Sequence, residues 1–222
     1  MKLNKNILVI APHPDDETIA MGGSIARLIN EKYNVHLLIV SGHLPPLYKN
    51  STFKKTFNEA MKAFKVLGVK KSKFLKIPAT FLKDIKVSKI NKLIHDEVIR
   101  IKPEIVFIPF PDRHIDHRVI FDSSVVAVRP NNKFFPKIVL CYETLSETHW
   151  NVPGIEPSFN PDYFIDISKY LKQKLKALEC YQSQINNNPS RGVDAVESLA
   201  KFRGSQNGFK YAEAFKVIRI IH

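Results

Sequence analysis

The sequence predicts an α/β protein with a Rossmann-like, doubly wound and mostly parallel sheet that carries helices on both faces. Short, continuous apolar runs alternate with longer segments of helical periodicity along the chain. Continuous apolar runs are typical of strands buried on both faces, and strands that alternate with helices build a parallel sheet. We find no internal repeat and no low-complexity linker, so residues 1–222 are predicted to form a single domain.

The predicted strands are the apolar runs that turn residues or prolines bound. Asn6–Ala11 places four aliphatic residues in a row, and the prolines that follow it stop the strand. The run Val35–Val40 ends at a Ser-Gly pair, which favours a turn. The later predicted strands are Ile105–Pro109, Lys137–Tyr142, Asp162–Ile167 and Phe215–Ile221.

The predicted helices follow from the spacing of apolar residues and from stop signals. A helix from about Asp16 to Asn30 follows the first strand, and Phe53–Leu67 is a helix that Gly68 ends. Val87–Ile101 places its aliphatic residues on one face and is ended by a proline. A further helix is predicted to begin near Asp116, and leucines at helical spacing predict a long one between residues 168 and 185.

The composition limits the classes of partner and compartment. The net charge of +13 is compatible with nucleic acid, an anionic membrane surface or an acidic substrate, but the lysines are dispersed and form no dense basic arm. This dispersion predicts solvated helix faces and no nucleic-acid partner. No apolar run approaches the ~20 residues of a membrane span. Cys141 and Cys180 make no disulfide framework, which predicts a reducing, cytoplasmic environment.

A cluster of charged residues follows the first predicted strand. His13, Asp15, Asp16 and Glu17 lie just past its carboxyl end, where doubly wound sheets place their binding sites. Crowding three acids is costly unless a cation or hydrogen bonds offset the repulsion. Helix capping would account for one or two of the acids but not for the histidine. From this stretch alone, capping and a metal site both stay open.

A second cluster follows the predicted strand Ile105–Pro109. His114 and His117 are three residues apart at the start of a helix, so both rings can face one way. Asp116 lies between them and can orient an imidazole through a hydrogen bond. Two clusters of histidine and aspartate at the ends of parallel strands favour a catalytic zinc site, for which two histidines, a carboxylate and an open position are typical.

Several motifs carry a family resemblance over nearly the whole chain. They are APHPDDE, HIDH, AMGGSIARL, NEAMKAFKVLGV, KALECYQSQ and RGSQNGFKYAEAF. With these motifs the chain resembles the LmbE-like (PIG-L) family of zinc-dependent N-acetylglucosamine deacetylases. The resemblance implies one zinc ion per chain, although iron or cobalt would suit the same ligand types.

The resemblance also implies roles for individual residues. The implied zinc ligands are His13, Asp16 and His117. Asp15 would be the general base that takes a proton from the attacking water. His114 would polarise the amide carbonyl or protonate the leaving amine, and Asp116 would hold the ring of His114. An amide is a poor electrophile, so the reaction needs a metal, a base that is not a ligand, and an acid.

The chain departs from the family pattern where substrate contacts are expected. Family members often carry an arginine at the position of Thr56, which here lies beside Lys54 and Lys55. A lysine supplies charge but not a bidentate fork, so an anionic substrate with a contact from Lys55 is one hypothesis. His43, at the end of the second strand, and Tyr142 are the other candidates for substrate contacts.

These inferences predict a metal-dependent N-deacetylase that acts on an N-acetylglucosamine-type sugar conjugate, a small-molecule partner. The alternatives are a deacylase of a non-sugar amide, a deacetylase of a polysaccharide precursor and, from a different class, a basic nucleic-acid-binding domain whose acids are helix caps. That last alternative predicts binding that falls steeply with salt. The sequence leaves the aglycone and the oligomeric state open, including a homo-oligomer.

Overall fold

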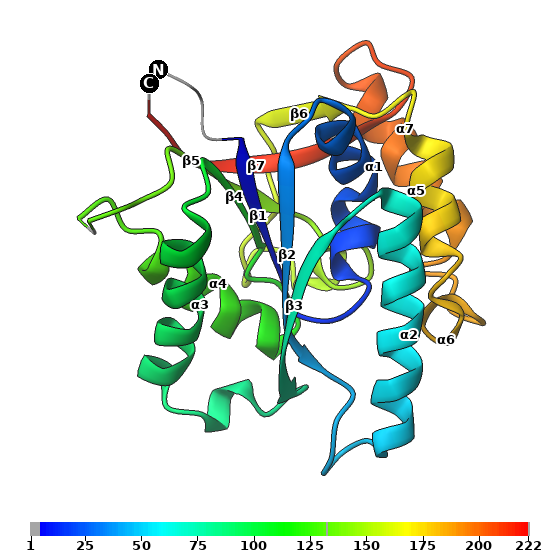
Figure 1. Ribbon diagram of the computed structural model, residues 1–222. Coiled ribbons are helices and arrows are strands. Elements are labelled where there is room, and N and C mark those ends of the chain that lie inside the picture. The colour runs from blue at the N-terminus through cyan, green and yellow to red at the C-terminus, as the bar shows by residue number, and fades with distance from the viewer. Residues whose placement is uncertain (1–4, 132, 222) are drawn as a thin grey trace.

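We describe a computed structural model that covers residues 5–131 and 133–221. Its strands form one seven-stranded sheet in the order β3-β2-β1-β4-β5-β7-β6 (Figure 1). The five neighbouring strands β3, β2, β1, β4 and β5 pair in parallel, whereas β7 pairs antiparallel with both β5 and β6. The strands are β1 (Asn6–Ala11), β2 (Asn34–Gly42), β3 (Lys71–Pro78), β4 (Ile105–Pro109), β5 (Ile138–Tyr142), β6 (Tyr163–Asp166) and β7 (Ala212–Ile220). The predicted doubly wound, mostly parallel sheet is confirmed.

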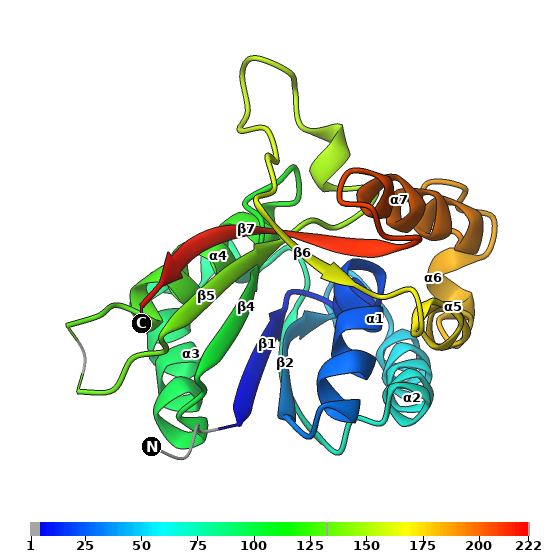
Figure 2. The ribbon, with the colours of Figure 1, turned by 90° about the horizontal axis from the view of Figure 1, so that it is seen from above.

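Helices cover both faces of the sheet (Figure 2). On one face, α1, α2 and α5 pack against one another, and on the other face α3 packs against α4. Helix α7 packs against β7. The helices are α1 (Asp16–Asn30), α2 (Asn50–Leu67), α3 (Val87–Ile101), α4 (Ile115–Ala127), α5 (Leu171–Leu178), α6 (Gln182–Ile185) and α7 (Val193–Ser205), with short 3-10 turns at Leu82–Asp84 and Thr148–Trp150.

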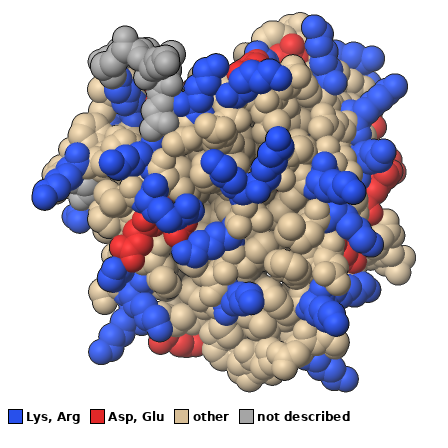
Figure 3. All heavy atoms as spheres, in the orientation of Figure 1, with Lys and Arg blue, Asp and Glu red and all other residues tan. Residues whose placement is uncertain are grey.

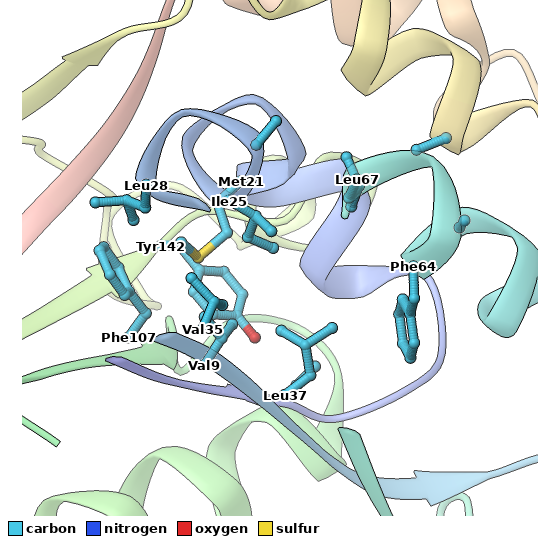
Figure 4. Close-up of a cluster of buried hydrophobic side chains, with 14 of the residues drawn as sticks. Val9, Met21, Ile25, Leu28, Val35, Leu37, Phe64, Leu67, Phe107 and Tyr142 are labelled. Atoms are coloured by element: carbon cyan, nitrogen blue, oxygen red, sulfur yellow. The ribbon is translucent and has the colours of Figure 1, made fainter. Parts of the chain in front are cut away.

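The central strand β1 supplies both halves of the core. Its side chains alternate between the two faces of the sheet, so Ile7 and Val9 join the cluster under α1 and α2, while Leu8 and Ile10 join the cluster under α3 and α4. Figure 4 shows the first cluster, with Val9 beside Tyr142. All four β1 side chains are fully buried, which explains why the strand reads as a continuous apolar run.

The structure differs from the sequence-based prediction in four places. Strand β3 was not predicted, because it is an edge strand whose lysines make it polar. The long helix predicted between residues 168 and 185 is two helices, α5 and α6, separated at residues 179–181. Helix α7 was not predicted, and the final strand begins at Ala212 rather than Phe215.

Helix α1 contains a kink that the second half of the chain stabilises. Met21 has non-helical dihedral angles, and the backbone N–H groups of Gly23 and Ser24 donate to the Glu213 carboxylate at 3.0 and 2.6 Å. The Nζ of Lys174 also donates to that carboxylate at 2.6 Å, and both side chains are buried. A Cβ atom on Gly23 would lie 2.8 Å from the Ile167 side chain, so a glycine is required for this close packing.

The surface is basic without forming a single basic patch on the face that Figure 3 shows. Lysine and arginine side chains are scattered over it, with apolar and neutral residues between them (Figure 3). This arrangement agrees with the interpretation of the +13 charge as solvated helix faces. Among the described residues, no helix combines the length and the apolar character that crossing a membrane requires.

Candidate active site

The two histidine–aspartate clusters meet at one point on the sheet. Strands β1 and β4 are parallel neighbours, and the strand order reverses between them, so the loops that follow them leave the sheet in the region where doubly wound folds bind ligands. The ring centroids of His13 and His114 lie 4.5 Å apart, and those of His114 and His117 lie 5.1 Å apart. Residues 103 positions apart in the sequence thus form one site.

The loop after β1 is held in an unusual backbone conformation. Asp15 has a φ of 130°, a region that few non-glycine residues adopt. Its backbone N–H donates to the fully buried carboxylate of Glu17 at 3.2 Å, and the hydroxyl of Tyr181 donates to the same carboxylate at 2.7 Å. Asp15 precedes α1, but its side chain makes no capping hydrogen bond. Helix capping therefore does not explain the acids of this loop.

Of the three predicted ligands, the two histidines approach the same carboxylate oxygen of the third, Asp16. The Oδ2 atom of Asp16 lies 3.2 Å from His13 Nδ1 and 3.3 Å from His117 Nε2. Tetrahedral zinc with bonds of 2.0–2.1 Å to nitrogen and oxygen would hold neighbouring ligand atoms about 3.3–3.4 Å apart. His117 Nε2 is buried and has no hydrogen-bond partner in the described part of the chain. The residues present therefore fit a zinc ion.

Two carboxylates support the predicted ligand histidines. Asp112 Oδ2 lies 2.9 Å from His117 Nδ1, and Asp116 Oδ2 lies 2.9 Å from His13 Nε2. Such contacts fix the tautomer and the orientation of a metal-binding imidazole. The side chain of Asp116 thus contacts the ring of His13, whereas its contact with the ring of His114, which the resemblance implied it would hold, is made by its backbone N–H. Asp112 was not singled out from the sequence.

His114 has a different environment from the other two histidines. Its Nδ1 accepts a hydrogen bond from the backbone N–H of Asp116 at 3.1 Å, so in the neutral ring the proton is on Nε2. Burial and the positive charges of His13 and His117 lower the pKa of His114 to about 4. The three histidines could also form a ligand set of their own, since one nitrogen from each lies within 4.8 Å of the others.

The charges around the site favour a cation. Burial disfavours protonation of His13, but the carboxylates of Asp116 and Asp16 outweigh burial and raise its pKa to about 9. Burial also raises the pKa of Asp15, with further repulsion from Asp16 and Glu17. Positive charge placed among these carboxylates, as a proton or as a metal ion, is therefore stabilised.

The site opens into a pocket of about 240 Å³. Its wall includes His43, whose ring packs edge-on against Tyr48 with 4.6 Å between centroids, and Thr80, whose N–H donates to Asp116 at 2.8 Å. The lining residues are His13, Asp15, Asp16, His43, Tyr48, Ala79, Thr80, His114, His117, Glu147, Gln184 and Arg191. The predicted substrate contact of His43 is compatible with this position.

The other two predicted substrate contacts do not line the pocket. Tyr142 is fully buried in the core and its hydroxyl donates to the Ile10 carbonyl at 2.7 Å (Figure 4). Lys55 is exposed on α2. Thr56, the departure from the family arginine, is buried and bonds the backbone of its own helix. No geometry among the described residues supports a substrate contact by Lys55 or Tyr142.

Glu147 and Arg191 line the pocket although neither residue was singled out from the sequence. Glu147 lies in the loop after β5, and Arg191 lies in the polar loop before α7. The segments around them carry no motif with a chemical meaning, so only the folded arrangement reveals their place.

Comparisons with known proteins agree with this geometry. A profile of the PIG-L family, described as GlcNAc-PI de-N-acetylase, matches residues 8–128. A diacetylchitobiose deacetylase of Thermococcus kodakarensis is 27% identical over 96% of this chain and 83% of its own. A solved structure of a conserved protein from Thermus thermophilus is 27% identical, with a TM-score of 0.79 over 97% of this chain and 96% of that one.

A second solved structure, an N,N'-diacetylchitobiose deacetylase from Pyrococcus horikoshii, shares the fold, with a TM-score of 0.75 and 24% identity over 98% of this chain and 85% of that one. The profile covers more than half of the chain and includes both clusters that meet at the carboxyl ends of β1 and β4. The chain therefore belongs to the PIG-L (LmbE-like) family.

Proposed function

We propose that this protein is a metal-dependent N-deacetylase that removes the acetyl group from an N-acetylglucosamine-type sugar conjugate. The observation that carries the proposal is the convergence of His13, Asp16 and His117. A second aspartate, Asp15, lies beside this set and is not one of the proposed ligands. Asp15 Oδ2 is buried, lines the same pocket and has no hydrogen-bond partner among the described residues. The family membership and the deacetylases among the relatives support the same activity.

The reaction adds water across an amide. The oxygen of water bonds to the acetyl carbon, the carbon–nitrogen bond breaks, and acetate and a free amine leave. A zinc ion held by His13, Asp16 and His117 would polarise the water and the carbonyl group. Its identity is part of the proposal, because other divalent metals suit the same ligand types.

Two side chains of this protein would move the protons. Asp15 Oδ2 accepts a proton from the attacking water, because Asp15 lines the pocket and this oxygen makes no hydrogen bond among the described residues. His114 presents its Nε2 proton, since the Asp116 N–H occupies Nδ1. That proton can hydrogen-bond the carbonyl oxygen as negative charge develops there. Protonated Asp15 then passes the proton it took from water to the departing nitrogen, which leaves as the amine.

The test is release of acetate from methyl N-acetyl-β-glucosaminide by the purified protein. The zinc-loaded protein is expected to release acetate and an equal amount of amine. Treatment with a chelator should abolish the activity, and added zinc should restore it. Acetate release that is unaffected by complete removal of metal would contradict the proposed metal dependence. We also propose a cytoplasmic location, because the described Cys141 and Cys180 are free thiols.

A further inference from the structure

Two oppositely charged side chains from separate loops meet on the pocket wall. Arg191 Nη2 donates to Glu147 Oε1 at 3.0 Å. Both side chains line the pocket and both are largely buried, with exposed fractions of 21% for Arg191 and 14% for Glu147. Neither side chain takes part in the proposed metal binding or proton transfer. Their position beside the reacting groups makes them candidates for substrate recognition.

Arg191 retains hydrogen-bonding capacity that the protein does not use. Its Nε is buried and has no partner among the residues that the structure describes. Its Nη1 lies 3.6 Å from Asp15 Oδ2, which is too long for a hydrogen bond. A buried donor without a partner costs free energy, and a ligand atom that accepts from it recovers this cost. The donor therefore indicates that a ligand acceptor belongs at this part of the wall.

The pair offers a donor and an acceptor side by side, which is what a sugar hydroxyl needs. A hydroxyl can donate to the Glu147 carboxylate and accept from the Arg191 guanidinium at the same time. Arg191 lies close to Asp15, the proposed base for the water that attacks the acetyl carbon. A ring hydroxyl must therefore lie near the amide to reach Arg191, and the one on the adjacent ring carbon, away from the glycosidic bond, satisfies this condition.

The charge of the pocket favours an uncharged sugar. Among the lining residues, Asp15, Asp16 and Glu147 are acids and Arg191 is the one lysine or arginine. A bound divalent cation would balance these groups and leave no surplus positive charge for a phosphate or carboxylate. The volume of about 240 Å³ lies below the ~300–1,000 Å³ of sites for larger ligands, which suits a single sugar ring.

We propose that Glu147 and Arg191 form a subsite for the ring hydroxyl next to the acetamido group, and that this subsite selects uncharged N-acetylglucosaminides over anionic ones. The inference rests on the proposed function, which it deepens. It replaces the hypothesis of an anionic substrate held by Lys55, which is exposed and outside the pocket.

The experiment compares three glycosides. They are methyl N-acetyl-β-glucosaminide, its analogue that lacks the hydroxyl next to the acetamido group, and its derivative phosphorylated on the primary hydroxyl. Wild-type protein should deacetylate the parent with a kcat/KM about 10–100-fold above that of the deoxy analogue, the factor expected for one hydrogen bond to charged groups. The phosphorylated derivative should be the poorer substrate relative to the parent.

Variants then assign the effect to the pair. Arg191→Ala and Glu147→Gln should lower kcat/KM on the parent and bring the ratio of parent to deoxy analogue close to one. Arg129→Ala is the matched control, because Arg129 is exposed at the end of α4, outside the pocket. It should keep the wild-type ratio. Thermal unfolding checks that each variant folds, and if Arg191→Ala does not, Glu147→Gln carries the test.

A binding measurement separates failure of the subsite from failure of the enzyme proposal. Calorimetry with the amine product, methyl β-glucosaminide, and its deoxy analogue should give a Kd about 10–100-fold weaker for the analogue in wild type. Equal kcat/KM and equal Kd for parent and analogue would overturn the subsite while the deacetylase activity stands. Faster turnover of the phosphorylated sugar would overturn the preference for uncharged substrates. Discrimination in binding without any acetate release would leave the subsite standing and refute the enzyme proposal.

Discussion

Replacing Asp15 or Asp16 by asparagine should disable the enzyme in two different ways. Asp16 Oδ2 lies 3.2 and 3.3 Å from the nitrogens of His13 and His117, so Asp16→Asn removes a charged ligand from the centre of the proposed set. Asp15 has no such contact with the ligand histidines, and its Oδ2 has no described hydrogen-bond partner. Asp15→Asn should therefore leave the metal site in place.

The expected size of each effect follows from these positions. A general base is typically worth ~10²–10⁴ in rate, so Asp15→Asn should lower kcat by that factor, or by about 2.7–5.5 kcal/mol in activation free energy. The loop should survive, because asparagine tolerates a positive φ better than most residues and keeps the size of aspartate. KM should change little if Asp15 acts mainly in the transition state. Asp16→Asn should lose most of its zinc and, with it, its activity.

The assay measures zinc content and steady-state kinetics on the same preparation of each variant, after dialysis against metal-free buffer. Wild type should hold about one zinc per chain, the number that a single mononuclear site predicts. A metal-free Asp15→Asn together with a zinc-loaded Asp16→Asn would exchange the two roles. Full metal content and full activity in both variants would refute the assignment of this loop to catalysis.

Three further predictions test other parts of the structure. His114→Ala should keep its zinc and lose ~10²–10⁴ in kcat, whereas loss of zinc would favour the three-histidine ligand set. Glu143 is buried, but hydrogen bonds from a histidine and an arginine lower its pKa in the folded protein. Its contribution to stability is therefore complete above the pKa of the unfolded chain, about 4.3, and is lost as the pH falls through the pKa of the folded protein. The thermal midpoint of wild type should then fall more steeply on acidification below about pH 4 than that of Glu143→Gln, and parallel curves would contradict this. Lys174→Met should lower the free energy of unfolding, measured by urea denaturation, by about 3–5 kcal/mol because it leaves the buried Glu213 carboxylate without its cation. The control Lys172→Met, at an exposed position, should change the free energy of unfolding little. An equal effect of both substitutions would show that the buried pair is not the cause.

The sequence predicted the interior of the sheet well and its borders poorly. Strands β1, β2, β4 and β5 are buried on both faces, so each leaves a mainly apolar run that is easy to recognise. Strand β3 lies at an edge, and its lysines hide it in a segment that reads as polar. The break between α5 and α6 was missed because Tyr181, fully buried there, continues the apolar pattern although its hydroxyl reaches Glu17.

The candidate site divides in the same way. His13, Asp16, His114 and His117 follow strands that the sequence reveals, so their meeting could be expected from the parallel topology. The pairing of carboxylates with histidine rings could not be predicted, because it depends on side-chain directions in two loops. The structure pairs Asp116 with His13 and Asp112 with His117.

Substrate contacts were the hardest part to predict. Tyr142 ends a strand near the site, but its side chain lies in the core under α1 and α2. Lys55 was favoured by its charge alone, although it is exposed on α2. The residues that line the pocket beyond the motifs come from loops whose approach to the site depends on the whole fold.

The origin of the pocket residues along the chain has a consequence for how the activity can be altered. The proposed ligands and the base lie before residue 118, whereas Glu147 and Arg191 come from loops, and Gln184 from α6, much later in the sequence. The proposed catalytic residues and the proposed hydroxyl subsite are thus encoded in separate stretches of the gene. Exchanging the loops around residues 147 and 191 between relatives offers a route to new substrate ranges that leaves the reaction itself unchanged. The exchange must preserve the hydrogen bonds of Tyr181 and Glu213 to α1, the helix that follows β1.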